Sequence, residues 1–190
     1  MKILMLVFLI ITLAFGETSE PTPDYNPRSL HNNLKKITGC DSYHKEELAM
    51  PNPDAYGSME GKFFRISCSN GIEYFVYLGR VNSCRASGCS IDRPSGEFEF
   101  FDYFSIYDSS YKVMQVSVYN YEATHGQEIT ARGWLKQFVG YKEGNFLEVG
   151  KNVDAISGAT ISVNGIVEDV KEKTVMLLNL SNNLSQRVIE

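Results

Sequence analysis

The middle of the chain has the pattern of β-strands, with runs of aromatic and β-branched residues separated by turn residues. Four segments have this character: residues 62–67, 72–78, 98–107 and 112–119. Ser69-Asn70-Gly71 separates the first two, and Asn-Gly between such runs predicts a tight hairpin. Asp108-Ser109-Ser110 separates the last two, and the polar segment 80–96 between the pairs is expected to be a long loop. We therefore predict an antiparallel sheet that begins near Lys62.

After residue 160 the apolar residues recur at intervals of three and four, which is typical of an α-helix packed on a sheet. The apolar face comprises Val163, Ile166, Val167, Val170, Thr174 and Leu177. Four charged residues are expected to face away: Glu168, Asp169, Lys171 and Glu172. Gly165 costs this helix about 1 kcal/mol relative to alanine, which suggests that something passes close to the backbone there.

Shorter elements complete the predicted fold. Helices are expected at residues 31–37 and 132–138, the second ended by Gly140, and a short strand at 146–149. From Asn179 the chain is polar, and we expect a frayed end. Strands followed by helices predict the α+β class, with a twisted, mainly antiparallel sheet and helices packed on it.

The N-terminal residues have the features of a secretory signal peptide. A basic start at Lys2 precedes an apolar run over residues 3–15 and the small Gly16. The run is short for a membrane span, so we expect cleavage and export, for instance to a periplasm; an uncleaved membrane anchor is the alternative. The predicted organisation is a signal peptide, a partly flexible leader, a globular domain and a polar tail, at residues 1–16, 17–60, 61–180 and 181–190.

Composition limits the possible functions. The chain has 18 Lys and Arg against 23 Asp and Glu, a net charge of −5, and no basic tract, which argues against nucleic-acid binding. We find no Gly-x-Gly-x-x-Gly motif for a nicotinamide cofactor and no Gly-x-Ser-x-Gly motif for a serine hydrolase. The 3 histidines have no recognisable metal-ligand spacing with the cysteines, so no metal site is expected.

The 4 cysteines, Cys40, Cys68, Cys84 and Cys89, are an even number in a chain expected to be exported, which favours disulfides. Cys84 and Cys89 are close enough for a local bridge, which would leave Cys40 to pair with Cys68; the other two pairings stay open. Arg85 would favour a thiolate at Cys84, so a working dithiol is an alternative. A structural bridge is favoured, because the spacing is wider than in the common oxidoreductase motif.

The segment from Asp154 to Thr160, Asp-Ala-Ile-Ser-Gly-Ala-Thr, carries the strongest indication of chemistry. It places a threonine hydroxyl on a turn of small residues at the predicted start of the long helix. The first N–H groups of a helix lack internal partners and the helix dipole adds positive charge there, so the turn suits a phosphate. Gly158 and Ala159 leave the backbone accessible to a bulky phosphorylated group. The alternative is an ordinary helix start capped by Ser157.

This segment resembles the flavin-attachment motif of the FMN-binding domain family, found in the peripheral flavin subunits of the Rnf complex and of sodium-translocating NADH:quinone reductase. In that family a flavin transferase esterifies the last threonine of the Ser-Gly-Ala-Thr run to the phosphate of FMN. The resemblance implies that Thr160 is the attachment residue and that Asp154, Ser157, Gly158 and Ala159 surround it as recognition positions. It also implies that residues 61–180 form an FMN-binding domain, with FMN at the N-terminus of the C-terminal helix.

A second similarity lies upstream, over residues 119–138. The family has a strand, a loop with His and Gly near Glu or Thr, and a short helix with an aromatic residue; the loop here has fewer Gly and Pro than is usual. The resemblance implies flavin contacts from His125, Glu128 and Trp134. His125 would bind the flavin or move a proton, with a turn or surface role as the alternative. Trp134 would stack on the flavin ring or belong to the core.

Together these features predict an exported flavoprotein that carries covalent FMN and transfers electrons outside the cytoplasm, as a redox subunit rather than a stand-alone enzyme. The expected partners are a flavin transferase during maturation and other redox proteins, including a membrane electron-transfer complex. Two alternatives remain. One is a cofactor-free, disulfide-stabilised secreted binding protein, and the other is a thiol–disulfide redox protein that uses Cys84 and Cys89.

Overall fold

A computed structural model describes residues 22–50, 60–83 and 99–187 of the chain. These residues form a five-stranded antiparallel sheet in which each strand pairs with the next along the sequence. The strands are β1 (Tyr43–Glu47), β2 (Gly61–Cys68), β3 (Glu73–Ser83), β4 (Glu99–Tyr107) and β5 (Val113–Tyr121). The predicted hairpin at Asn70-Gly71 joins β2 to β3.

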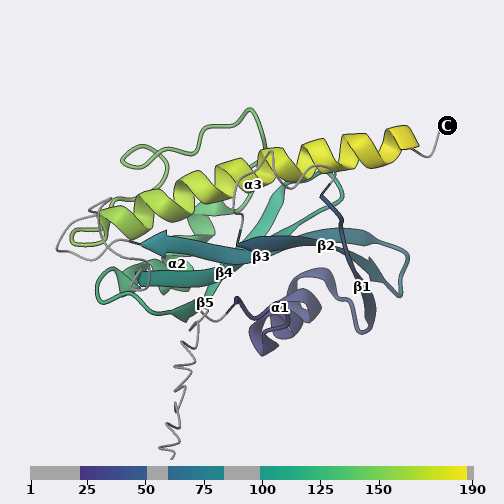
Figure 1. Ribbon diagram of the computed structural model, residues 1–190, viewed down its shortest axis with the longest axis horizontal. Helices are drawn as coiled ribbons and strands as arrows, with labels where there is room; N and C mark the ends of the chain where they lie inside the picture. The colour runs from purple at the N-terminus through teal and green to yellow at the C-terminus, as the bar shows by residue number, and fades with distance from the viewer. Residues whose placement is uncertain (1–21, 51–59, 84–98, 188–190) are drawn as a thin grey trace, which may run out of the picture.

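Helices cover both faces of this sheet (Figure 1). Helix α1 (Arg28–Thr38) lies on one face, and the long helix α3 (Thr160–Arg187) runs along the other. Three short helical segments follow β5: η2 (Gln127–Thr130), α2 (Arg132–Leu135) and η3 (Lys136–Phe138). This arrangement confirms the predicted α+β class. In the described part of the chain, no helix combines the length and the apolar character that a membrane span requires.

The central strand β3 is buried on both sides, because its alternate side chains enter two separate hydrophobic clusters. Tyr74, Val76 and Leu78 pack with α1, whereas Phe75, Tyr77 and Val81 pack with α3. The predicted end of this strand was wrong. The strand continues past Leu78 to Ser83, so residues 80–83 of the expected loop belong to β3.

A buried ion pair explains why β3 continues through Arg80. The Arg80 guanidinium donates from Nε to Asp102 Oδ1 at 2.8 Å and from Nη2 to Asp102 Oδ2 at 3.1 Å. Both side chains are only 2% exposed, and Asn120 Nδ2 donates to the same carboxylate at 3.1 Å. The guanidinium also stacks on the ring of Phe100, 3.4 Å from its centroid. These contacts satisfy a charge that would otherwise be costly to bury.

Two glycines in the sheet make room for the ring of Tyr77. Gly61 and Gly79 are paired across β2 and β3, and the Tyr77 ring lies over both. A Cβ atom on Gly61 or Gly79 would approach Tyr77 Oη to 2.2 or 2.1 Å, far inside van der Waals contact. The ring then packs against Phe63 and Tyr103 under α3, with centroids 5.0 and 5.6 Å away. These glycines therefore permit a continuous aromatic layer below the helix.

The sheet begins earlier than predicted, with β1 at Tyr43 rather than near Lys62. The expected helix at residues 31–37 is confirmed and extends over Arg28–Thr38. Residues before it also pack on the sheet, since Tyr119 Oη donates to the Asp24 carbonyl at 2.8 Å and Tyr25 contacts the cluster under α1. The described part of the expected leader thus comprises a helix that covers the second face of the sheet and a strand that extends its edge.

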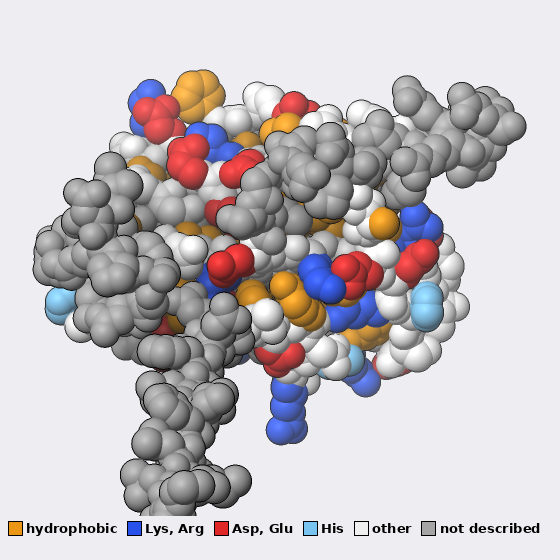
Figure 2. All heavy atoms as spheres, in the orientation of Figure 1, with side chains coloured by type: hydrophobic (Ala, Val, Ile, Leu, Met, Phe, Trp, Pro, Cys, Tyr) orange, Lys and Arg blue, Asp and Glu red, His pale blue; other side chains and the backbone are white. Residues whose placement is uncertain are grey.

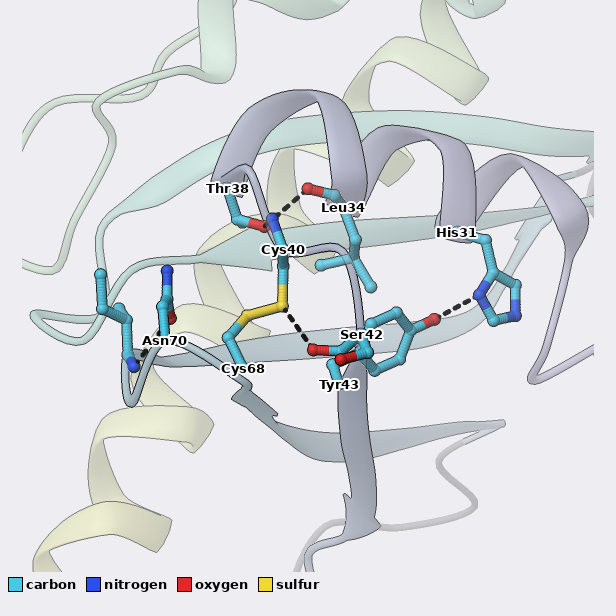
Figure 3. The surroundings of a disulfide bond; sticks show 9 residues. His31, Leu34, Thr38, Cys40, Ser42, Tyr43, Cys68 and Asn70 are labelled. Atoms are coloured by element: carbon cyan, nitrogen blue, oxygen red, sulfur yellow. Dashed lines mark hydrogen bonds between the residues drawn. A yellow bond between two sulfur atoms is a disulfide. The ribbon is translucent and has the colours of Figure 1, made fainter.

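A disulfide between Cys40 and Cys68 ties this N-terminal part to the sheet, as the favoured pairing predicts. Figure 3 shows the bond linking the chain just after α1 to the end of β2. Both cysteines are buried beside Leu34, and Thr38 Oγ1 accepts from the Cys40 N–H at 3.2 Å. Cys84 and Cys89 lie outside the described residues.

Loss of this disulfide should lower the free energy of unfolding by about 2–4 kcal/mol, because the bond closes a loop over a sequence separation of 28 residues. The double variant Cys40→Ala/Cys68→Ala tests this in urea without leaving an unpaired thiol. We expect the same shift when the wild-type protein is treated with a reductant. A midpoint unchanged in both experiments would contradict a stabilising role for the bond.

Helix α3 matches the predicted apolar face, with Val163, Ile166, Val167, Val170, Thr174 and Leu177 all buried. Gly165 also has the predicted close neighbour, because a Cβ atom there would lie 2.9 Å from Val81 Cγ1 on β3. The expected fraying from Asn179 was wrong. The helix continues to Arg187, and Leu180, only 2% exposed, extends the apolar face by one more turn.

Asp169 does not face away from the sheet as predicted. Its carboxylate accepts a hydrogen bond from Tyr103 Oη at 2.6 Å and lies 3.3 Å from Lys173 Nζ. Burial raises the pKa of this carboxyl, although Lys173 and Tyr103 both act in the opposite direction. A hydroxyl from β4 and an ammonium one turn further along α3 thus allow an acid to sit between helix and sheet.

The segment after η3 also differs from prediction. Residues 146–149 do not form a strand; a single bridge between Val149 and Val153 is present instead. Phe146 is 72% exposed, so the apolar residues that suggested a strand do not share a buried face.

On the surface seen in Figure 2, acidic and basic side chains of the described residues are interspersed and form no broad basic patch.

Candidate functional site

The predicted turn before the long helix is present. The Ala159 N–H donates to the Ile156 carbonyl at 3.1 Å, and Gly158 adopts φ +81°, a left-handed conformation that favours glycine. Helix α3 begins at Thr160, and the Ala159 carbonyl accepts its first hydrogen bond, from the Val163 N–H at 2.9 Å. Thr160 is exposed. A threonine hydroxyl therefore stands at the first residue of the helix, as the sequence indicates.

No side chain in the described part of the chain caps this helix start. The residue before the helix is Ala159, which has no polar side-chain atom, and Ser157 lies two residues further back without a described hydrogen bond to the first turn. The N–H groups of Thr160, Ile161 and Ser162 are thus the orphan donors of the helix. An ordinary cap by Ser157 is not formed among the described residues, whereas the geometry leaves donors for an anion.

A pocket of about 190 Å³ opens at this helix start. It is lined by Ser83, Glu99, His125, Gly158, Ala159, Thr160, Ile161 and Ser162. Of the predicted site residues, Thr160, Ala159, Gly158 and His125 come together here. Ser157 adjoins the pocket in sequence, while Asp154, Glu128 and Trp134 are not among its lining residues. Glu128 is exposed on η2.

Sequence reasoning missed four lining residues, and they come from three parts of the chain. Ser83 and Glu99 are the paired ends of β3 and β4, and Ile161 and Ser162 belong to the first turn of α3. Glu99 is buried and accepts a hydrogen bond from Thr124 Oγ1 in the loop that carries His125. Ser162 could have been identified from the sequence, because it is a polar residue next to the apolar face of the predicted helix.

The His125 loop is fixed to the start of α3 by a tyrosine on β5. Tyr121 Oη donates to the His125 carbonyl at 2.5 Å and lies 3.2 Å from Ser162 Oγ. Burial raises the pKa of the Tyr121 hydroxyl, so it stays protonated and able to donate at neutral pH. The ring stacks on Phe101, 5.8 Å between centroids, which ties the loop to the sheet. His125 itself remains exposed at the pocket.

Gly126 permits the close approach of this loop to α3. It adopts φ +90°, and a Cβ atom there would lie 2.9 Å from Tyr121 Oη, 3.0 Å from Ser162 Oγ and 3.2 Å from Ala159 Cβ. A larger residue must therefore displace the Tyr121 and Ser162 hydroxyls, or shift the loop relative to the helix start. The glycine that the sequence comparison noted beside His125 is explained by this contact.

We expect Gly126→Ala to lower the free energy of unfolding by about 1–3 kcal/mol, because it adds both overpacking and backbone strain at positive φ. Gly133→Ala is the matched control, since no atom lies within 4 Å of the added Cβ and the residue is helical in α2. Alanine there should be neutral or stabilising by up to about 1 kcal/mol. Equal destabilisation of both variants in urea would show that the contacts of Gly126 are unimportant.

The turn before α3 is held from its other side by the segment α2–η3. Trp134 Nε1 donates to the Asp154 carbonyl at 2.9 Å, and the Asp154 N–H donates to Gln137 Oε1 at 2.8 Å. Trp134 also packs edge-on against the buried Phe138, with centroids 5.4 Å apart. Trp134 is therefore a half-buried residue at the edge of the core that contacts the motif, and Gln137 is a second contact that the sequence did not indicate.

Comparison with known families agrees with this geometry. Residues 103–173 match the family model described as the FMN-binding domain. The matched region runs from β4 into α3 and contains the His125 loop, the Trp134 segment and the turn to Thr160. No curated protein and no solved structure matches the chain. The match over residues 103–173 supports an FMN-binding domain in this part of the chain, and thus a flavin-binding protein.

Proposed function

We propose that this protein is an electron carrier with FMN joined to Thr160 by a phosphoester bond. The observation that supports the proposal is the position of Thr160. Its exposed side chain stands at the first residue of α3 and at the edge of a pocket, beside N–H groups that no side chain of the described residues caps. A phosphate joined to Thr160 Oγ1 would lie next to those N–H groups, where the helix dipole favours negative charge. The family assignment supports FMN as the cofactor.

Attachment requires a donor that is already activated. In the proposed step a flavin transferase uses a flavin adenine dinucleotide: Thr160 Oγ1 bonds to the phosphorus next to the riboflavin part, and the pyrophosphate bond breaks. Adenosine monophosphate leaves, and the threonine proton passes to a base of the transferase or to solvent. The atoms balance without an oxidant or reductant. Thr160 acts only as the acceptor hydroxyl, which its exposure permits.

The residues around the pocket have separate roles in this proposal. Glu99, whose carboxylate accepts a hydrogen bond from Thr124 Oγ1, would border the bound flavin, and His125 would offer a ring nitrogen for a hydrogen bond at the exposed side. Ile161, 47% exposed, provides apolar surface next to Thr160. The bound flavin supplies one- and two-electron chemistry, and the protein holds it in place.

The proposed setting is outside the cytoplasm. The predicted signal peptide at residues 1–16 supports export, and covalent attachment would prevent loss of the flavin where none is supplied. In this setting the electrons come from and go to other redox proteins, such as a membrane complex. The absence of a nicotinamide-binding motif from the sequence favours protein partners over a nicotinamide donor.

Redox cycling of the loaded protein tests the electron-carrier proposal. The full chain is produced with a flavin transferase, freed of unbound flavin and titrated anaerobically with dithionite. The flavin absorbance should bleach and should return in full when a protein oxidant such as cytochrome c is added. Covalent flavin that cannot be reduced, or that fails to pass electrons to any protein or quinone acceptor tried, would contradict the carrier function.

A further inference from the structure

We propose that Trp134 and Gln137 are positioning residues that hold the attachment motif in the conformation that the flavin transferase recognises. The inference rests on the proposed function, because it concerns the maturation of the same site. Neither residue lines the pocket, and both act through Asp154, the first residue of the motif. Their contribution is thus to the shape of the acceptor segment rather than to the bound flavin.

Three hydrogen bonds form a closed arrangement around Asp154. The indole N–H of Trp134 holds the Asp154 carbonyl, and the amide oxygen of Gln137 holds the Asp154 N–H, at 2.9 and 2.8 Å. Gln137 Nε2 in turn donates to the Trp134 carbonyl at 3.0 Å, which fixes the orientation of the amide. Both backbone hydrogen-bonding groups of one residue are therefore bound by side chains of a single helical segment.

That helical segment is firmly anchored in the core. Leu135 and Phe138 are 3% and 0% exposed, and the Trp134 ring packs against Phe138. On the motif itself, the preceding Val153 is 1% exposed, and Ile156 packs against the same cluster. The start of the motif is thus fixed to the core by side-chain packing and by hydrogen bonds.

The rest of the motif is left open to a large partner. Asp154, Ser157, Gly158 and Thr160 are all exposed, and the Asp154 carboxylate has no hydrogen bond or ion pair among the described residues. The contacts with Trp134 and Gln137 use only backbone atoms of Asp154. A transferase therefore meets a segment whose backbone is already ordered and whose recognition side chains are free, so that little conformational entropy is lost on binding.

Without these contacts the motif would populate several conformations, and only a fraction would fit the transferase. The apparent affinity of the acceptor falls by that fraction, while the chemical step on the competent form is unchanged. Loss of one such hydrogen bond corresponds to about a 3- to 10-fold change. We therefore expect a higher KM for the acceptor protein with an unchanged kcat.

The test measures initial rates of flavin attachment at several concentrations of the full-length acceptor protein, at a temperature where circular dichroism shows every variant folded. Gln137→Met and Trp134→Phe keep the size or the ring of the side chain but remove the hydrogen bonds to Asp154. Each should raise KM about 3- to 10-fold. Gln137→Glu keeps an acceptor oxygen for the Asp154 N–H but loses the donor to the Trp134 carbonyl, so it should restore part of the loss. Lys136→Met is the matched control, because Lys136 is exposed on the same segment.

Wild-type KM in both Gln137→Met and Trp134→Phe would overturn the proposal, as would a fall in kcat at constant KM or no difference between the Met and Glu variants of Gln137. Failure of the proposed function gives a different result. In that case Thr160→Val would still acquire flavin, or the wild-type protein would acquire none, whatever the state of Trp134 and Gln137.

Discussion

Thr160→Val should carry no covalent flavin while remaining folded. Valine is close in shape to threonine but has no hydroxyl, so the phosphoester cannot form. Thr160 is exposed at the first residue of α3, and the described residues give its hydroxyl no hydrogen bond that folding would require. The expected change in stability is within about 0.5 kcal/mol, as for other surface substitutions.

Fluorescence of the denatured protein, after production with a flavin transferase, measures this effect. Wild-type protein should remain fluorescent and the variant should not. Ser157→Ala is the companion variant, and we expect it to lower the yield without abolishing attachment, because it changes a proposed recognition position and keeps the proposed acceptor. Persistent adduct in Thr160→Val would place the attachment elsewhere, and unfolding of the variant would favour a purely structural role for the turn.

Arg80→Met should destabilise the protein by about 3–5 kcal/mol. The substitution keeps a long side chain in place but removes the guanidinium, which leaves Asp102 buried with Asn120 as its described hydrogen-bond donor. An uncompensated buried charge is among the largest effects that a single substitution produces. Because Arg80 and Asp102 are cross-strand partners in β3 and β4, the loss should affect cooperative unfolding of the whole sheet.

Arg65→Met is the matched control. Arg65 on β2 lies 3.8 Å from Glu46 on β1, and the two side chains are 31% and 56% exposed. A solvent-exposed pair of this kind contributes about 0–1 kcal/mol. Urea denaturation of both variants should therefore separate a large loss for Arg80 from a small one for Arg65. Similar small losses in the free energy of unfolding would mean that the buried pair is no more stabilising than the exposed one.

The sequence was most informative where a local rule governs the structure. The apolar face of α3 follows from its period, the β2–β3 turn follows from Asn70-Gly71, and the turn before Thr160 follows from its small residues. Gly165 shows that a single residue of low helix propensity can indicate a close neighbour, since Val81 of β3 occupies the space that a side chain there would fill.

Two of the wrong predictions share a physical cause: each concerned a polar residue that has a partner distant in sequence. Arg80 was taken to begin a loop, although Asp102 on the next strand makes it a buried strand residue. Asp169 was expected to face solvent, although its carboxylate accepts a hydrogen bond from Tyr103 and pairs with Lys173 beneath the helix. Local polarity cannot reveal such partners, because they meet only when the sheet and helix have assembled.

The candidate site shows the same division. Thr160 and its small neighbours were recognisable from a contiguous motif, and His125 from the order of elements around it. The contacts of Trp134 and Gln137 with Asp154 were not recognisable, because they join a side chain to a backbone group 20 and 17 residues away. Glu99 was missed because a single acidic residue in a predicted strand does not by itself indicate that the residue lines a pocket.

The most direct test of the central claim is mass spectrometry of the full chain after production with a flavin transferase. The account predicts a protein heavier by FMN less one water, with that mass confined to the peptide that contains Thr160. A protein of unmodified mass, from which any flavin separates on denaturation, would contradict it.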